Sequence, residues 1–265
     1  MTSERTIWPE LVVLSPGRAR AVLDRGWWSW AGPHGGLLGA LLLRTSQQLA
    51  GDREPRAITV HYFSAPPEGP VEVSAALLRE GGSSAVVRAD LHTPDGTLAA
   101  TAVLTSGRAA RRPTASYDVL APPPAPPPGQ CEPLEIPPEL VPFTGQFSYR
   151  LVGPAPLSGG DHAELVAWVR LRTDEPYDPA ALVVLTDVLP PALYGATAAP
   201  VPVPTVELHV VLAGRPPVQG WVLTRIATRT AGDGWCVDDS EVWSPDGRLL
   251  AQARQVRRVL GELTT

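Results

Sequence analysis

The sequence has 265 residues, of which 44% are hydrophobic and 18% charged, and its formal net charge is -5. This length fits two packed units of average size, and the lack of a strong basic field argues against nucleic acid as the main partner. No apolar run reaches the roughly 18 residues of a membrane span, and no apolar signal core follows the N-terminus, so we expect a cytoplasmic protein with no membrane partner.

The first part of the chain predicts one helix followed by an antiparallel meander. After a weak early strand region comes an apolar segment, residues 36–49, which we expect to be helical. Strand-like runs rich in Val, Thr and Leu follow it. They cover residues 57–63, 71–79 with 85–91, and 98–104.

A proline-dense segment divides the chain. It covers residues 113–142 and includes a nearly unbroken proline run at 122–128. Polyproline geometry predicts a semi-rigid spacer without helix or sheet, although such prolines can also form recognition motifs. We therefore expect a first unit at residues 1–112, a linker at 113–142 and a second unit at 143–265.

The second part repeats the order of the first. Its predicted helix covers residues 179–189, and the strand-like runs are 203–212, 220–230 with 235–243, and 249–257. The Pro-Asp-Gly turn at 94–96 recurs at 245–247, and this tripeptide is typical of hairpins because Gly accepts a positive φ. One helix with an antiparallel meander is an α+β unit that buries its helix by wrapping the sheet around it, and two copies can join edge to edge.

With these features the sequence resembles acyl-CoA thioesterase II and its bacterial relatives over nearly its whole length. Residues 32–41, which include His34-Gly35-Gly36, resemble the His-Gly-Gly helix start of hotdog proteins. Residues 182–189 resemble the family helix that carries a catalytic aspartate. The resemblance implies a double hotdog, in which two antiparallel sheets each wrap a central helix and join into one continuous sheet.

Three residues match the catalytic positions of that family in the family order. Asp187 falls at the catalytic aspartate, Thr205 at the start of a strand, and Gln255 on the last strand. The resemblance implies that Thr205 and Gln255 help to hold a water beside Asp187. Asp187 also stands out by itself, because an unpaired carboxylate in an apolar run is costly. The alternatives are an outward-facing or capping Asp187, and ordinary strand roles for the other two.

Several residues near the first helix are candidates for binding substrate. The backbone N–H groups of Gly35 and Gly36 at the helix start could polarise a thioester carbonyl, the alternative being a plain glycine-rich turn. His34 fits capping or packing better than catalysis. Trp28 and Trp30 could line an acyl pocket, although core packing or a subunit interface suits such aromatic clusters as well.

The expected function is hydrolysis of an acyl-CoA or acyl-carrier-protein thioester by Asp-activated water at the interface of the two halves. Single-hotdog relatives often place an acid several residues after the His-Gly-Gly turn. Residues 41–43 are all leucine here, so one site rather than two is implied. A Gly-x-Ser-x-Gly elbow is missing, which disfavours an α/β-hydrolase.

Other functions on the same scaffold stay open. They are a dehydratase or cyclase reaction in biosynthesis, and a non-catalytic module that binds acyl or polyketide groups. Cys131 and Cys236 have no Cys or His at zinc spacing, so no metal is expected, and nothing implies a redox cofactor. A disulfide between them and a homo-oligomeric state are both left open.

Overall fold

The computed structural model describes residues 8–110, 112, 117, 119–172, 175–214 and 218–262. Its first half contains the elements β1 (Leu11–Ser15), β2 (Arg18–Leu23), α1 (Gly35–Ala50), β3 (Glu54–Tyr62), β4 (Gly69–Glu80), β5 (Ser84–His92) and β6 (Leu98–Gly107). Its second half contains β7 (Phe147–Val152), β8 (Glu164–Leu171), α2 (Pro179–Leu185), β9 (Thr205–Leu212), β10 (Val222–Gly232), β11 (Trp235–Trp243) and β12 (Leu249–Arg258).

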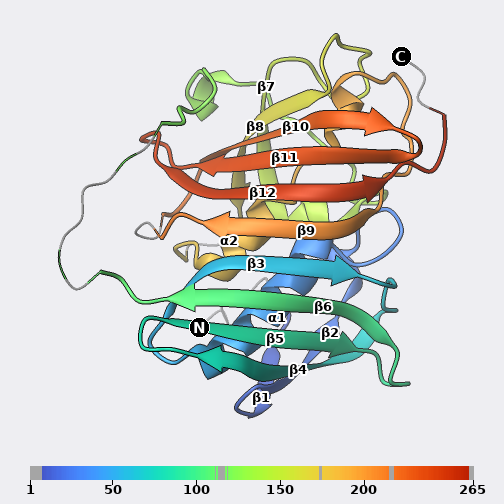
Figure 1. The fold of residues 1–265 in the computed structure, drawn as a ribbon. Helices are drawn as coiled ribbons and strands as arrows, with labels where there is room; N and C mark the ends of the chain where they lie inside the picture. The colour runs from blue at the N-terminus through green and yellow to red at the C-terminus, as the bar shows by residue number, and fades with distance from the viewer. Residues whose placement is uncertain are drawn as a thin grey trace, which may run out of the picture.

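All strands of the described residues belong to one antiparallel sheet of twelve strands, in the order β1-β2-β4-β5-β6-β3-β9-β12-β11-β10-β8-β7. The two halves have the same strand order when counted outward from the middle of the sheet. In the first half it is β3, β6, β5, β4, β2 and β1, and in the second it is β9, β12, β11, β10, β8 and β7. The halves join where β3 pairs with β9, with Thr59 opposite His209. Both helices lie behind the sheet in Figure 1, which confirms the predicted double hotdog.

The two helices begin with side-chain caps and differ in length. His34 caps α1 by accepting the Leu37 N–H, and α1 ends at Gly51, whose φ is 66°. Asp178 caps α2 by accepting the Ala181 N–H, and Pro179 occupies the first helical turn. Asp at the cap and Pro in the first turn are residue types that favour a helix start, because they satisfy or remove unpaired N–H groups.

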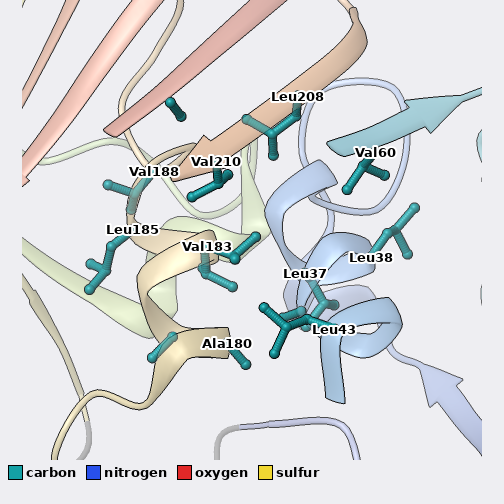
Figure 2. Close-up of a cluster of buried hydrophobic side chains, with 14 of the residues drawn as sticks. Leu37, Leu38, Leu43, Val60, Ala180, Val183, Leu185, Val188, Leu208 and Val210 are labelled. Carbon is teal, nitrogen blue, oxygen red and sulfur yellow. The ribbon is translucent and has the colours of Figure 1, made fainter. Parts of the chain in front are cut away.

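The main hydrophobic core runs across both halves. Leu37, Leu38 and Leu43 of α1 belong to the same cluster as residues of the second helix, and inward-facing residues of β3 and β9 complete it. Figure 2 shows Val60 of β3 in the same cluster as residues of the other half, drawn there as Ala180, Val183, Leu185, Val188, Leu208 and Val210. Because the core is shared, the helices are held against each other, and this fixes the position of the residues at their ends.

Three details differ from the sequence-based expectation. The early regions were expected as strands from a weak signal, and the difference is only in how regular they are: each forms a pair of strands, β1 with β2 and β7 with β8. The second helix ends at Leu185 rather than 189, because its last turn tightens when the Asp187 N–H donates to the Val184 carbonyl at 3.0 Å.

The third difference is in the linker, which contains regular structure. Residues 128–130 and 142–146 form short 3-10 helices, and Pro133 forms an isolated bridge with Arg150. Residues 113–116 and 118 of the linker lie outside the described residues. Cys131 and Cys236 are buried and do not form a disulfide.

Candidate active site

Asp187 lies just beyond the end of α2, in a segment that is held firmly. The Thr186 hydroxyl donates to the Val183 carbonyl at 2.8 Å, and Ser240 of β11 donates to the Thr186 carbonyl at 2.7 Å. The Asp187 side chain is only 10% exposed. Its carboxylate therefore faces the interior between the two halves instead of bulk solvent.

Donors from both halves converge on the Asp187 carboxylate. Its Oδ2 accepts the backbone N–H of Gly36 at 2.9 Å. Its Oδ1 accepts the side-chain amide of Gln255 at 3.1 Å, and the Arg257 guanidinium donates to the same oxygen at 3.5 Å. Together these donors fix the orientation of the carboxylate.

His34 fastens the Asp187 backbone to the start of α1. Its Nδ1 accepts the Leu37 N–H at 3.2 Å, so the single ring proton is on Nε2, which donates to the Asp187 carbonyl at 2.9 Å. The ring packs on Phe143 with centroids 4.3 Å apart. His34 thus caps a helix and positions Asp187 in one arrangement.

Gly35 and Gly36 allow the two halves to approach closely. A Cβ on Gly35 would lie 3.1 Å from Asp187 Oδ2, and one on Gly36 would lie 3.0 Å from the Val184 Cα. Since the Gly36 N–H is bound to Asp187, it is not free to polarise a substrate carbonyl. The Gly35 N–H has no hydrogen-bond partner among the described residues, and Gly35 lines the cavity described below.

Tyr62 holds the other end of the same peptide unit. Its hydroxyl donates to the Gly35 carbonyl at 2.8 Å, while the N–H of that peptide donates to Asp187. Burial, reinforced by the nearby Asp187 and opposed by Arg257, raises the pKa of Tyr62 well above its ordinary value. The hydroxyl therefore stays protonated and can act as a donor.

Thr205 and Gln255 form a chain of hydrogen bonds that ends at Asp187. The Thr205 hydroxyl, at the start of β9, donates to Gln255 Oε1 at 3.0 Å. Gln255 on β12 is fully buried, and its amide nitrogen donates to Asp187. The amide orientation is set by these two partners. The structure thus brings together all three residues that the sequence nominated for catalysis.

A cavity of about 650 Å³ opens over these residues. This volume lies within the usual range for small-molecule pockets. Asp187, Thr205, Arg257 and Gly35 belong to its wall, while most of the remaining wall is apolar. The linker contributes to that wall, and so does the proline-rich segment after Asp187: Ile136, Val141, Phe143, Val188, Leu189, Pro190, Pro191, Val201, Pro202, Val203 and Pro204.

The two tryptophan candidates lie in different places. Trp30 is 54% exposed and belongs to the cavity wall. Trp28 is buried in the core and does not line this cavity, so its position gives no support to a role in binding substrate.

The duplicated position in the other half carries different chemistry. His34 caps α1 and contacts Asp187, and correspondingly Asp178 caps α2 and contacts Arg44, with Arg44 Nη2 donating to Asp178 Oδ2 at 3.0 Å. The second cap thus pairs with an arginine, where the first cap contacts the residue that carries the carboxylate, and a proline follows the second cap where α1 has Gly35. Within the described residues, the arrangement around Asp187 is therefore present in one copy.

Sequence reasoning missed several residues of the site, among them Tyr62, Arg257 and Phe143. Alternation along the strands would have pointed to two of them, because Tyr62 shares a face with Ile58 and Val60, and Arg257 shares a face with Gln255. Phe143 lies just after the linker, in the 3-10 helix at 142–146, and carried no such signal.

The part of the chain that the structure describes lacks two further kinds of site. It contains no group of three or more His, Cys, Asp or Glu side chains placed to hold a metal ion. It also contains no helix of the length and apolarity needed to cross a membrane.

Comparisons with known proteins agree with this architecture. The family model for the acyl-CoA thioesterase N-terminal domain matches residues 24–107, and that for the acyl-CoA thioesterase C-terminal domain matches residues 121–259. No curated protein sequence matches the chain.

Solved structures share the fold across their full length. A hotdog-fold protein of unknown function from Alicyclobacillus acidocaldarius is 24% identical, with a TM-score of 0.87, and the alignment covers 96% of this chain and 97% of that one. An acyl-CoA thioesterase II from Mycobacterium marinum is 19% identical, with a TM-score of 0.73 and 97% of each chain covered. At these identities the likeness shows the fold alone.

Proposed function

The chain belongs to the acyl-CoA thioesterase family, and on that premise we propose that it hydrolyses an acyl thioester with a water molecule that Asp187 activates. The observation that supports this most is the position of Asp187. Its carboxylate lies in the wall of the apolar cavity and accepts donors from both halves. A general base must reach both the water and the substrate, and this placement permits both.

In the proposed reaction, the water is held by Asp187 and Thr205. The Thr205 hydroxyl donates to Gln255, so its oxygen can accept a hydrogen bond from the water, while Asp187 accepts the other hydrogen. Gln255 orients both partners, because it binds each of them and does not itself line the cavity. Two fixed acceptors leave the water lone pair directed away from them, towards a bound thioester carbon.

The steps follow from this arrangement. Asp187 takes a proton from the water as the oxygen attacks the thioester carbon. The carbonyl oxygen becomes negatively charged, and the free N–H of Gly35 at the start of α1 is the donor available to it. When the tetrahedral intermediate collapses, the carbon–sulfur bond breaks, and the thiolate leaves with the proton returned from Asp187. The products are a carboxylic acid and a free thiol.

The acyl group occupies the apolar part of the cavity. Its wall combines stiff proline rings with the aromatic side chains of Phe143, Phe63 and Trp30. Proline and aromatic side chains lose little conformational entropy when they contact a ligand, so such a wall favours apolar acyl groups. The carrier that presents the thioester is coenzyme A or an acyl-carrier protein.

The test is thiol release from acyl-CoA thioesters of short, medium and long chains, with the same acyl groups on a carrier protein as a second arm. We expect thiol release by the natural protein. An Asp187→Asn variant should lose about 10²- to 10⁴-fold in kcat, the usual contribution of a general base. Its circular dichroism should match that of the natural protein.

A matched control is Asp178→Asn, at the other end of the same helix. Asparagine caps a helix as well as aspartate does, and Asp178 pairs with Arg44 away from the cavity. This variant should keep its activity. Full turnover in folded Asp187→Asn would refute the proposed mechanism, and binding of acyl-CoA without thiol release would favour a binding module instead.

A further inference from the structure

A second carboxylate lies behind the site. Asp238 of β11 is fully buried, and its Oδ1 accepts the Thr228 hydroxyl at 2.7 Å. Its Oδ2 lies 3.5 Å from the backbone nitrogen of Ala192, which donates to it, and 3.1 Å from Arg257 Nε. The Arg257 Nε–H does not point at Asp238 Oδ2, so the contact between these two groups is an ion pair without a hydrogen bond. A buried carboxylate is unfavourable unless it is paired in this way.

Arg257 connects this carboxylate to Asp187. It is 5% exposed and follows Gln255 by two residues on β12, so both side chains point to the same face of the strand. Its Nη2 donates to Asp187 Oδ1 at 3.5 Å, and its Nη1 donates to the Val203 carbonyl at 3.3 Å. Each nitrogen of the guanidinium thus faces a different partner, which leaves the group in a fixed position.

The other titratable groups that face Asp187 are neutral. His34 of α1 lies 3.6 Å from Oδ2 and carries one ring proton, as its hydrogen bonds require. Tyr62 of β3 keeps its proton because burial raises its pKa. An arginine guanidinium does not lose its proton in proteins. Among the described residues, Arg257 is therefore the permanent cation within ion-pair distance of Asp187.

We propose that Arg257 is a positioning residue that keeps Asp187 ionised, and that buried Asp238 tunes this effect by sharing the charge of Arg257. The inference rests on the proposed function, because it concerns the base of that reaction. A cation near a carboxylate favours its charged form and makes it a weaker base. Asp238 shares the charge of Arg257, which weakens the effect of that charge on Asp187 and leaves Asp187 able to take a proton from water.

Two variants should move the pH dependence of kcat/KM in opposite directions. In Asp238→Asn the charge of Arg257 is no longer shared and acts on Asp187 alone. The acid limb of the kcat/KM profile should then move to lower pH by about one unit, and the plateau kcat should fall because Asp187 becomes a weaker base. The double variant Arg257→Gln/Asp238→Asn removes the cation without leaving an unpaired buried charge. Its acid limb should move to higher pH by about one unit.

A matched control lies on the same two strands. Arg254 of β12 pairs with Asp239 of β11, with Arg254 Nε 2.7 Å from Asp239 Oδ1, and the Arg254 side chain is 62% exposed. Asp239 also pairs with Arg229 at 3.0 Å, so the Arg254→Gln/Asp239→Asn variant removes one cation and one carboxylate from the outer face and leaves Arg229 in place. It should leave the acid limb unchanged.

The outcomes separate this inference from the proposed function. If the natural protein hydrolyses thioesters and both inner variants fold but keep its acid limb, Arg257 and Asp238 have only a structural role and the inference is wrong. If the natural protein hydrolyses no thioester, the titration of Asp187 is followed instead by carboxyl carbon NMR, assigned by its loss in Asp187→Asn. Movement of that titration in the two directions given above supports the charge coupling, and an unmoved titration overturns it.

Discussion

Replacing Gly36 by alanine tests whether the close approach of the two halves sets the geometry of the base. The new Cβ would lie 2.8 Å from His34 Cε1, 3.0 Å from the Val184 Cα and 3.2 Å from the Asp187 Cβ. Ordinary contacts of a Cβ begin at about 3.4 Å, so α1 and the end of α2 must move apart by a few tenths of an ångström. That movement lengthens the 2.9 Å hydrogen bond from the Gly36 N–H to Asp187.

The expected stability change is small, while the activity change is large. Overpacking costs about 1–3 kcal/mol, and the higher helix propensity of alanine returns about 1 kcal/mol. The net loss of roughly 0–2 kcal/mol should lower Tm by only a few degrees in a chain of this size. Displacing a catalytic group by a fraction of an ångström to 1 Å costs up to about 100-fold in rate. We therefore expect a fall in kcat of that order.

Gly39→Ala provides the control, one turn along the same helix. Its Cβ would meet two side-chain ends in the core, Val183 Cγ1 at 3.1 Å and Val60 Cγ2 at 3.5 Å, and would reach the Tyr62 hydroxyl only at an ordinary van der Waals distance of 3.8 Å. Thermal unfolding and thioester turnover are measured for both variants. Gly39→Ala should lose comparable stability and keep kcat within about threefold. If the two variants lose kcat equally, or if folded Gly36→Ala is fully active, the geometric argument fails.

Two further predictions concern the hydrogen-bond chain and the buried tyrosines. Thr205→Val should lower kcat about 10- to 100-fold with little change in KM, because it removes the hydroxyl that binds Gln255, and Thr205→Ser should restore most of the rate. An effect on KM alone would contradict this role. Burial raises the pKa of four described tyrosines, so the folded chain holds their protons more tightly than the unfolded chain does. Their contribution to the free energy of unfolding is therefore complete below about pH 10, and it is lost as the pH rises above that value. They are Tyr62, Tyr149, Tyr177 and Tyr194. Tm measured against pH should drop in this range together with the rise of phenolate absorbance, and phenolate formation in a chain that stays folded would disagree.

Much of the fold could be predicted because short-range sequence patterns indicate its helices, strands and turns. Apolar helices, alternating strands and two Pro-Asp-Gly turns are short-range signals, and the turns form as expected, with positive φ at Gly96 and Gly247. The shorter strands β1, β2, β7 and β8 carried weaker alternation. The second helix was predicted too long, because the tightened turn at Thr186 depends on hydrogen bonds that an apolar pattern does not reveal.

The sequence by itself determined that Asp187, Thr205 and Gln255 were worth testing, because resemblance and chain order need no coordinates. Only the tertiary structure decided how they are connected. Gly36 contacts Asp187 across 151 positions of the chain and Gln255 contacts it across 68, and such contacts exist only once a shared core has pressed the two helices together. For the same reason the charge coupling proposed for Arg257 and Asp238 could not be predicted from sequence: the effect of a buried charge depends on which charges surround it, and folding alone brings those together.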